Sequence, residues 1–327
     1  MSTYLITGIT GHIGNVVASK LLAQGKSVVG LALPGDRCNM INCKIYYGDL
    51  LDKESMRPVF EQEHDLNIIH CAGKISVGSF DGLAMWNVNV NGTIHMLELA
   101  QEYKAAKFIY VSSVHAITEK PQGQMIIENP CFSSDQVSGD YARSKAEASR
   151  RVMEMQKKGL NACIVHPSGI IGPYDYQNGQ MNRMFRAFLK GYIPIAVAGG
   201  YDFVDVRDVA DGIISCIKKG KAGECYILSG HYIKIKDMLN IAAALSGRKK
   251  IKHCVSANVA KKTAPVVEKI CKMVNKSPIY TPYSIETLAS NGLFSNKKAE
   301  EELGFHIRPM EESIRDQMMW MKSQKKI

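Results

Sequence analysis

Three side chains in the middle of the sequence, Ser113, Tyr141 and Lys145, are of types that could pass a proton to or from a substrate. Tyr141 and Lys145 are four residues apart in a segment with helical patterning, so both project from one face. A tyrosine titrates near ~10, and a nearby ammonium favours its phenolate form. We therefore expect Lys145 to lower the pKa of Tyr141 toward the range useful for general acid–base catalysis. Such pairs also occur by chance on surface helices, and serines at strand ends are often structural. Whether these three residues are catalytic therefore depends on the elements that surround them.

A glycine-rich turn near the start of the sequence could bind phosphate. Gly8, Gly11 and Gly14 are spaced three residues apart, after a short apolar run and before a segment with helical periodicity. Glycine lets the backbone approach a pyrophosphate closely, and the following helix N-terminus offers unpaired N–H groups. Because the triplet lies between a predicted strand and a predicted helix, it indicates a dinucleotide-binding loop. The expected contacts come from Gly8, Thr10, Gly11, His12, Ile13 and Gly14.

Short apolar runs alternate with helical patterns through the first two-thirds of the chain. Buried strands are predicted at 3–8, 27–33, 44–49, 67–73, 107–113 and 161–168. Helices are predicted between them, for example at 13–25 and 91–104. Repeated alternation of this kind, with unbroken apolar strands, predicts an α/β fold of the Rossmann type, a doubly wound parallel sheet covered on both faces.

The pattern changes after Pro173, where a helical segment rich in Met and aromatic residues begins. Residues 203–217 and 225–230 then predict a helix and a strand that return to the sheet. We expect an NAD(P)-binding Rossmann domain at 1–172, joined by 201–230. The remaining segments, 173–200 and 231–327, predict a smaller, mainly helical lobe that binds substrate.

The composition of this 327-residue chain, with 46% apolar and 22% charged residues, is that of a soluble globular protein. The first residues enter a short apolar run directly, which predicts no exported leader, and we expect a cytoplasmic protein without membrane insertion. The nine cysteines include no C-x-x-C pair. They predict reduced thiols rather than disulfides, and no metal site is expected.

The formal charge of +10 is concentrated near the end of the sequence, where residues from His231 onward include 18 Lys and Arg against 9 Asp and Glu. The segment 248–276 is especially basic. It could be a solvated face, a lid, or a patch that attracts an acidic ligand or a membrane surface. Nucleic acid is not an expected partner, because no helix-turn-helix, zinc-finger or RNP pattern accompanies the charge.

The glycine spacing together with Ser113, Tyr141 and Lys145 resembles the extended short-chain dehydrogenase/reductase family over nearly the whole chain. The resemblance implies that Lys145 also binds the nicotinamide ribose, that Ser113 donates to the substrate oxygen, and that Asn89 is a structural or proton-relay residue. It favours Ser113 over Ser112. It further implies cofactor contacts from Asp49, Leu50, Cys71, Ala72, Gly73, Lys74, Pro167, Ser168 and Gly169.

The cofactor is NAD or NADP. Members of the family usually carry Asp or Arg where this chain has Ala32 and Leu33. Asp36 and Arg37, just beyond, could bind the ribose 2′-hydroxyl or a 2′-phosphate respectively. The missing arginine at Leu33 favours NAD.

The segment from His166 to Pro173 resembles the dihydroflavonol 4-reductase and 3β-hydroxysteroid dehydrogenase branch of the family. Sugar-nucleotide enzymes commonly carry an asparagine where this chain has Gly169. The resemblance implies hydride transfer between NAD(P)(H) and a fairly large apolar ketone or secondary alcohol, steroid-like or flavonoid-like. The residues expected to contact it are Ser113, His115, Tyr174, Tyr176, Met181, Met184 and Phe185, although core packing is an alternative for Met184 and for His115.

Two other functions are compatible with the sequence. One is an NAD-dependent nucleotide-sugar epimerase or dehydratase. The other is a non-catalytic NAD(P)-sensing regulatory protein, although such proteins usually lose the tyrosine or the lysine. Many relatives are homodimers, and the sequence leaves the oligomeric state, the substrate and the direction of reaction open.

Overall fold

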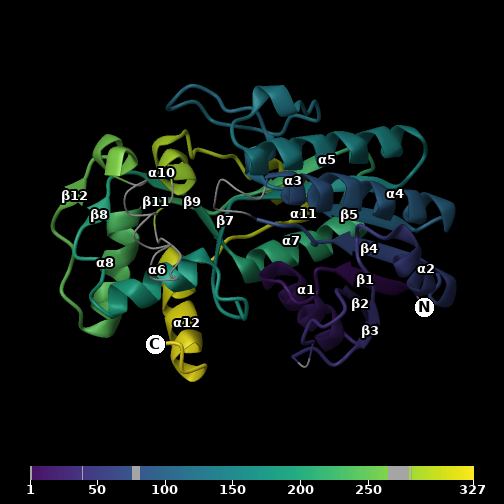
Figure 1. Cartoon of the computed structure of the whole chain (residues 1–327), viewed down its shortest axis with the longest axis horizontal. Helices are drawn as coiled ribbons and strands as arrows, with labels where there is room; N and C mark the ends of the chain where they lie inside the picture. Colours follow the sequence, from purple (N-terminus) through teal and green to yellow (C-terminus); the bar gives the residue numbers. More distant parts are fainter. Residues whose placement is uncertain (1, 39, 76–81, 264–279, 281) are drawn as a thin grey trace.

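The computed structural model describes residues 2–38, 40–75, 82–263, 280 and 282–327. Its main feature is a seven-stranded parallel sheet with the strand order β10-β6-β5-β4-β1-β2-β3 (Figure 1). The strands are β1 (Thr3–Thr7), β2 (Ser27–Ala32), β3 (Lys44–Tyr47), β4 (Leu66–His70), β5 (Lys107–Val111), β6 (Ala162–Pro167) and β10 (Cys225–Leu228). All six strands predicted in the first two-thirds are present, and the predicted Rossmann arrangement is confirmed.

Helices cover both faces of this sheet, as the unbroken apolar strands require. Figure 1 shows α1 (His12–Ala23) and α7 (Val206–Lys219) below the sheet and α4 (Gly92–Glu102) and α5 (Asp140–Lys157) above it. The helix α2 (Lys53–Gln62) packs beside α4, and α11 (Lys297–Leu303) packs on α7. Each layer buries its own hydrophobic cluster against the sheet.

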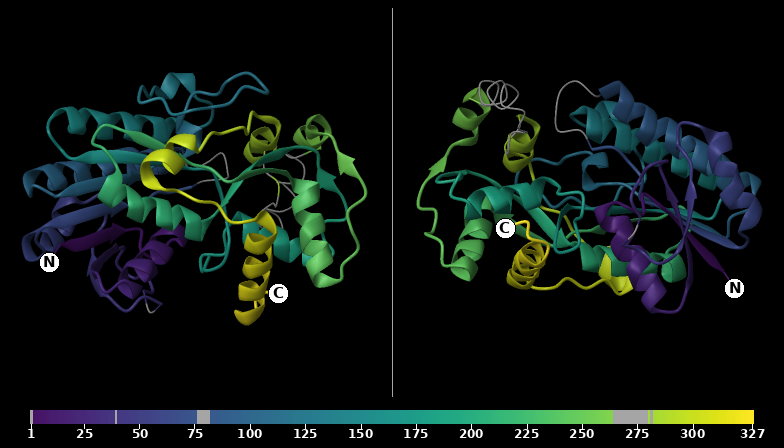
Figure 2. Two further views of the ribbon diagram at one scale, coloured as in Figure 1. Left: turned by 180° about the vertical axis from the view of Figure 1, so that it is seen from behind. Right: turned by 60° about the horizontal axis from the view of Figure 1, so that its bottom comes forward.

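A second group of elements lies beyond the carboxyl ends of the strands (Figure 2). It includes a three-stranded sheet of β7 (Gly169–Ile171), β9 (Gly200–Asp205) and β11 (His231–Lys234), and the pair β8 (Ala196–Val197) and β12 (Cys254–Val255). Its helices are α6 (Gln180–Leu189), α8 (Ile235–Ser246), α10 (Pro282–Ala289) and α12 (Met310–Ser323).

The segment 203–217 was expected to be one helix, but the structure divides it at Asp205, the last residue of β9. Asp205 caps the helix α7, since its side chain accepts a hydrogen bond of 2.8 Å from the backbone N–H of Arg207. The strand β10 pairs with β6 in the large sheet, and α7 packs beside α1. Ion pairs of Arg207 with Asp316 and of Arg308 with Asp208, both at 2.7 Å, attach the C-terminal segment to α7.

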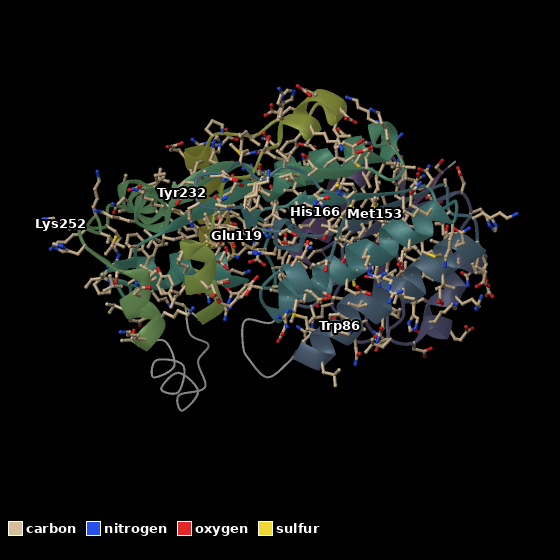
Figure 3. All side chains as sticks on the ribbon, turned by 90° about the horizontal axis from the view of Figure 1, so that it is seen from above. Trp86, Glu119, Met153, His166, Tyr232 and Lys252 are labelled. Atoms are coloured by element: carbon tan, nitrogen blue, oxygen red, sulfur yellow. The ribbon has the colours of Figure 1, made fainter. Side chains whose placement is uncertain are left out.

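The basic segment 248–276 is only partly described. Arg248, Lys249, Lys250 and Lys252 are exposed, and Figure 3 shows Lys252 at the end of the molecule far from His166. The segment's lid and membrane-surface hypotheses rest mainly on residues 264–276, which lie outside the described residues. No helix in the described part of the chain is long and apolar enough to cross a membrane.

Candidate active site

The glycine-rich loop joins β1 to α1 at the carboxyl edge of the sheet. Gly8 has a φ of +64°, and a Cβ there would lie 2.8 Å from the backbone N and Cα of Ala72, so only glycine fits. The N–H of Gly11 donates to the carbonyl of Gly8 at 2.9 Å and closes the turn. The helix α1 starts at His12 without a side-chain cap, so its first N–H groups are available to an anion.

Two further segments surround this loop. The loop 71–73 after β4 is held by a hydrogen bond of 3.1 Å from the N–H of Ala72 to the hydroxyl of Thr7. On the opposite side, His12 donates from Nε2 to the carbonyl of Pro173 at 2.8 Å, and burial lowers the pKa of His12. The glycine loop is therefore packed between the end of β4 and the turn at Pro173.

The carboxylate of Asp36 lies beside the glycine loop, where it accepts a hydrogen bond of 3.2 Å from the hydroxyl of Thr10. Arg37 is exposed and Leu33 is half exposed. Asp49 is partly buried and accepts from the N–H of Leu51 at 2.9 Å. Asp36 is thus hydrogen-bonded directly to the loop after β1.

Ser113 and Tyr141 are brought together at the ends of β5 and α5. Ser113 caps the short 3₁₀ helix η2 (Val114–Ala116), and its hydroxyl lies close enough to Tyr141 to lower the pKa of that phenol. The neighbouring Ser112 is instead bound to Ser149 on α5 at 2.8 Å. The structure therefore pairs Ser113, not Ser112, with the tyrosine.

The pKa of Tyr141 differs from the expectation that Lys145 lowers it. Burial raises this pKa to about 12, and the neighbouring Ser113 hydroxyl offsets only part of the effect. The ammonium of Lys145 donates to the carbonyl of Val111 at 2.9 Å and lies 4.8 Å from the centre of the Tyr110 ring. Burial also lowers the pKa of Lys145 to about 8. The loss of water around both groups outweighs their proximity along the helix.

Asn89 connects these residues to the loop after β4. It lies in a π-helical turn, η1 (Asn87–Asn91), between α3 (Gly82–Trp86) and α4. Its Nδ2 donates to the carbonyl of Lys74 and to the hydroxyl of Ser144, both at 3.0 Å, and its Oδ1 accepts from the N–H of Lys74 at 2.7 Å. Ser144 in turn donates to the carbonyl of Tyr141 at 2.8 Å. One asparagine side chain thus fixes loop and catalytic helix together.

A buried histidine, which the sequence analysis did not single out as a site residue, extends this network. Thr93 donates to the carbonyl of Asn89 at 2.7 Å, so its oxygen accepts from Nε2 of His70 at 3.1 Å. Nδ1 of His70 must then accept from the hydroxyl of Thr7 at 2.7 Å. Burial lowers the pKa of His70 to about 3, so the ring stays neutral. The sequence did contain a sign of this role, because His70 is a histidine at the end of an otherwise apolar strand.

The segment after β6 lies beside the same site. His166 is buried and donates from Nδ1 to the carbonyl of Ser113 at 2.9 Å. Ser168 is buried, and its N–H donates to the carbonyl of Leu228 at 3.3 Å. A Cβ on Gly169 would lie 2.7 Å from the ring of Phe203, so the backbone passes directly against β9.

Besides Ser113, the residue expected to bind substrate that the structure places next to Tyr141 is His115, with ring centres 6.1 Å apart. Burial lowers the pKa of His115 to about 4. Tyr201 stacks on His115 at 5.5 Å and bonds its Nε2 at 3.3 Å, while Tyr283 lies 5.8 Å away. The sequence analysis missed both tyrosines, because neither has a local motif.

The other expected substrate residues are elsewhere. Met184 and Phe185 are buried in the hydrophobic core, and Met181 packs against it. Tyr174 and Tyr176 contact Trp320 on α12 edge to face, at 6.3 Å and 5.3 Å. The structure does not gather these five around Tyr141.

Comparison with known proteins places this site in a family. A family model described as the NAD dependent epimerase/dehydratase family matches residues 4–229, from the first strand to the last strand of the parallel sheet. The chain belongs to the NAD dependent epimerase/dehydratase family. Members of this family are NAD-dependent enzymes that act on small-molecule substrates.

Two relatives match nearly the whole length of this chain. The sterol demethylase protein B of Methylococcus capsulatus is 27% identical, covering 98% of both chains. A putative dihydroflavonol 4-reductase of Synechocystis is 28% identical, covering 98% of this chain and 94% of the relative. The crystal structure of gox2253 superposes with a TM-score of 0.85 at 29% identity, covering 99% of both chains. These relatives confirm the expected resemblance to the reductase and hydroxysteroid dehydrogenase branch of the family.

The glycine loop of this family member fits a dinucleotide. The backbone at Gly8 and Gly14 leaves no room for a Cβ, and the uncapped start of α1 faces the same loop. A Cβ on Gly73 would lie 3.4 Å from Nζ of Lys145, so the loop 71–73 borders the lysine as well. The donor groups suited to a pyrophosphate and a ribose therefore lie along two neighbouring loops, the glycine loop and the loop 71–73.

Proposed function

We propose that this protein interconverts a ketone and a secondary alcohol with NAD(H), using Tyr141 as the general acid–base. The observation that carries the proposal is that Ser113 and Tyr141 come together at the carboxyl edge of the sheet, with Lys145 one helical turn further along α5 and the glycine loop at the same edge. The relatives named as a sterol demethylase protein and a dihydroflavonol 4-reductase support an apolar substrate, steroid-like or flavonoid-like.

In the reductive direction, Ser113 and Tyr141 donate hydrogen bonds to the carbonyl oxygen and polarise it. Tyr141 passes its proton to that oxygen as the carbonyl carbon gains a hydride. The bound nicotinamide supplies that hydride, or accepts it in the reverse direction. In oxidation the phenolate of Tyr141 takes the hydroxyl proton. Because its pKa is about 12, Tyr141 is protonated near neutral pH and is ready to act as the acid.

Lys145 is proposed to bind the ribose hydroxyls next to the nicotinamide, and Asn89 to position Lys74 and α5 around it. Asp36 is the residue we assign to the adenosine ribose, which favours NAD. The pyrophosphate is assigned to Gly8, Thr10, Gly11, His12, Ile13 and Gly14. The remaining cofactor contacts are assigned to Arg37, Asp49, Leu50, Cys71, Ala72, Gly73, Lys74, Pro167, Ser168 and Gly169.

One contact favours a reductase over a sugar-nucleotide epimerase. The position that commonly carries asparagine in sugar-nucleotide enzymes is Gly169, and a side chain there would meet both the Phe203 ring and the carbonyl of Asp202, 3.0 Å from a Cβ. The space for a side chain that could grip a diphosphate is therefore filled by the neighbouring strand.

The test is a screen of ketones and alcohols with NAD(H) and NADP(H), followed by the absorbance of reduced nicotinamide. Turnover is expected with the wild-type chain and should be lost in Tyr141→Phe, while NAD affinity stays nearly unchanged. Retained turnover in Tyr141→Phe would remove the tyrosine from the mechanism. Thermal stabilisation by UDP-sugars in the presence of NAD would favour the epimerase alternative, and NAD binding without turnover on any substrate would favour a sensor.

A further inference from the structure

A cavity of about 160 Å³ lies behind the candidate catalytic residues. It is bounded by the segment 114–119 after Ser113, by Ala142 beside Tyr141, and by residues of α10 and the loop that follows it. A cavity of about 150 Å³ is known to hold benzene. The volume therefore suits one six-membered ring, and not a fused system of four rings.

Flat side chains form one wall of this cavity. The rings of His115 and Tyr201 are stacked nearly parallel, with an angle of 9° between them, and Tyr283 and Phe294 complete the wall. Such surfaces favour a planar ring over a branched aliphatic group. His115 also touches Tyr141 edge to face, so a ring in the cavity lies a short linker away from the hydroxyl of Tyr141.

The polar side chains of the cavity are rich in hydrogen-bond acceptors. Glu119, labelled near the centre of the view in Figure 3, is an exposed residue, and its Oε1 accepts from the N–H of Asn291 at 2.7 Å, which leaves Oε2 for another donor. Glu286 is the second carboxylate, paired at 3.4 Å with the exposed Lys261. Among the described residues that line the cavity there is no lysine or arginine. The lining thus favours a ligand that donates hydrogen bonds and disfavours an anionic one.

We propose that the substrate is a ketone or secondary alcohol that carries, through a short linker, one planar ring with a hydroxyl group, and that this ring occupies the cavity. This inference rests on the function proposed above. The ring packs against the aromatic wall that Tyr201 and His115 form, and its hydroxyl donates to Glu119 or Glu286. Both carboxylates are exposed, and a hydrogen bond to a charged group is stronger than one between neutral groups, so the hydroxyl has a measurable effect on affinity.

The test compares 4-(4-hydroxyphenyl)butan-2-one with 4-phenylbutan-2-one, which differ in one phenolic hydroxyl. With the wild-type enzyme and NADH, the hydroxylated ketone should have a KM lower by about tenfold or more. The double variant Glu119→Gln/Glu286→Gln should remove most of this difference, while Glu311→Gln, which alters an exposed acid on α12, should keep it. Equal KM values for the two ketones in the wild-type enzyme would overturn the inference.

A binding measurement separates this inference from the proposed reaction. Calorimetry of the wild-type protein with saturating NAD should detect 4-ethylphenol and not ethylbenzene, and the double variant should lose the phenol signal. If 4-ethylphenol binds in this way but no ketone is turned over, the cavity assignment stands and the proposed reaction fails. If ketones are turned over but 4-ethylphenol does not bind, the reaction stands and the cavity assignment is overturned.

Discussion

Asn89 and Lys74 are joined by two hydrogen bonds that run in opposite directions, from the backbone N–H of Lys74 to Oδ1 at 2.7 Å and from Nδ2 to the backbone carbonyl of Lys74 at 3.0 Å. The side-chain amide of Asn89 therefore binds both backbone polar groups of Lys74, in the way that a residue on a neighbouring β-strand would. The same Nδ2 also binds Ser144, which holds the carbonyl of Tyr141. Loop and catalytic helix share one buried anchor.

Asn89→Asp should damage this anchor without changing its size. An aspartate cannot donate to the carbonyl of Lys74, so two oxygens would face each other in a buried place. We expect unfolding free energy to fall by about 1–3 kcal/mol and kcat to fall by about tenfold. Asn91→Asp, in the same π-helical turn but exposed, should change neither. Urea unfolding and steady-state kinetics measure both effects, and an unchanged kcat in Asn89→Asp would contradict the anchor.

Lys145→Met should raise stability while it abolishes turnover. The pKa of Lys145 falls from 10.5 to about 8 through burial, so the folded state binds this proton less tightly than the unfolded state. The lysine therefore opposes folding fully below pH 8, by roughly 3 kcal/mol, and the effect disappears as the pH rises to 10.5. Thermal unfolding should show a higher Tm for the variant near neutral pH and a smaller gain near pH 10.5. A variant that is less stable than wild type at both values would refute this reasoning.

Ketone reduction should slow as the pH rises through about 8, because Lys145 then loses its proton. Tyr141, with a pKa of about 12, remains protonated across the same range and does not produce the decline. The profile of kcat/KM at saturating NADH measures this directly. Lys145→Arg keeps a positive charge and should move the decline to higher pH. A wild-type profile of kcat/KM that is flat through pH 8 would show that reduction does not depend on the protonation of Lys145.

Gly8→Ala and Gly25→Ala form a matched pair. Both glycines have positive φ, +64° and +69°, so alanine is strained by about 1–2 kcal/mol at either position. A Cβ on Gly25 meets nothing within 4 Å, whereas a Cβ on Gly8 meets the backbone of Ala72. We expect Gly25→Ala to retain NAD affinity and Gly8→Ala to lose tenfold or more, together with a larger loss of stability. Equal effects in NAD titrations of the two variants would exclude a special role for the loop.

Asp36→Ser should shift cofactor preference toward NADP. The carboxylate lies beside Thr10 on the glycine loop, where its charge would repel a 2′-phosphate. The ratio of kcat/KM for NADH over NADPH should fall by about tenfold or more. Arg37→Ser serves as the comparison. It removes a positive charge that could attract the 2′-phosphate of NADPH, so it should not lower the ratio. A ratio that does not change in Asp36→Ser would place the ribose elsewhere.

The sheet and its phosphate loop were predictable because their signals are local. Each strand is a continuous apolar run, and Gly8, Gly11 and Gly14 follow the first strand directly. Tyr141 was predicted from its four-residue spacing to Lys145, and Ser113 from its place at a strand end together with the family resemblance. Asp205 was missed as a boundary because the valines on both sides of it suit a strand and a buried helix equally.

The walls of the cavity were not predictable in the same way. Tyr201 lies 86 residues from His115 in the chain, and only the fold brings their rings together. Met184 and Phe185, on an amphipathic helix, suit a pocket and a core equally well by type. The pKa of Tyr141 also depends on burial from every side, which the four-residue spacing to Lys145 does not contain.

The π-helical turn at residues 87–91 makes the active site sensitive to residue number as well as to residue type. A π turn corresponds to one extra residue within an α-helix, and each residue advances a helix by roughly 100°. Removing one residue would restore a regular helix, with good internal hydrogen bonds, and turn Asn89 away from Lys74 and Ser144. A sequence alignment would show such a change as a harmless gap between two helices, although it would disconnect the loop from the catalytic helix.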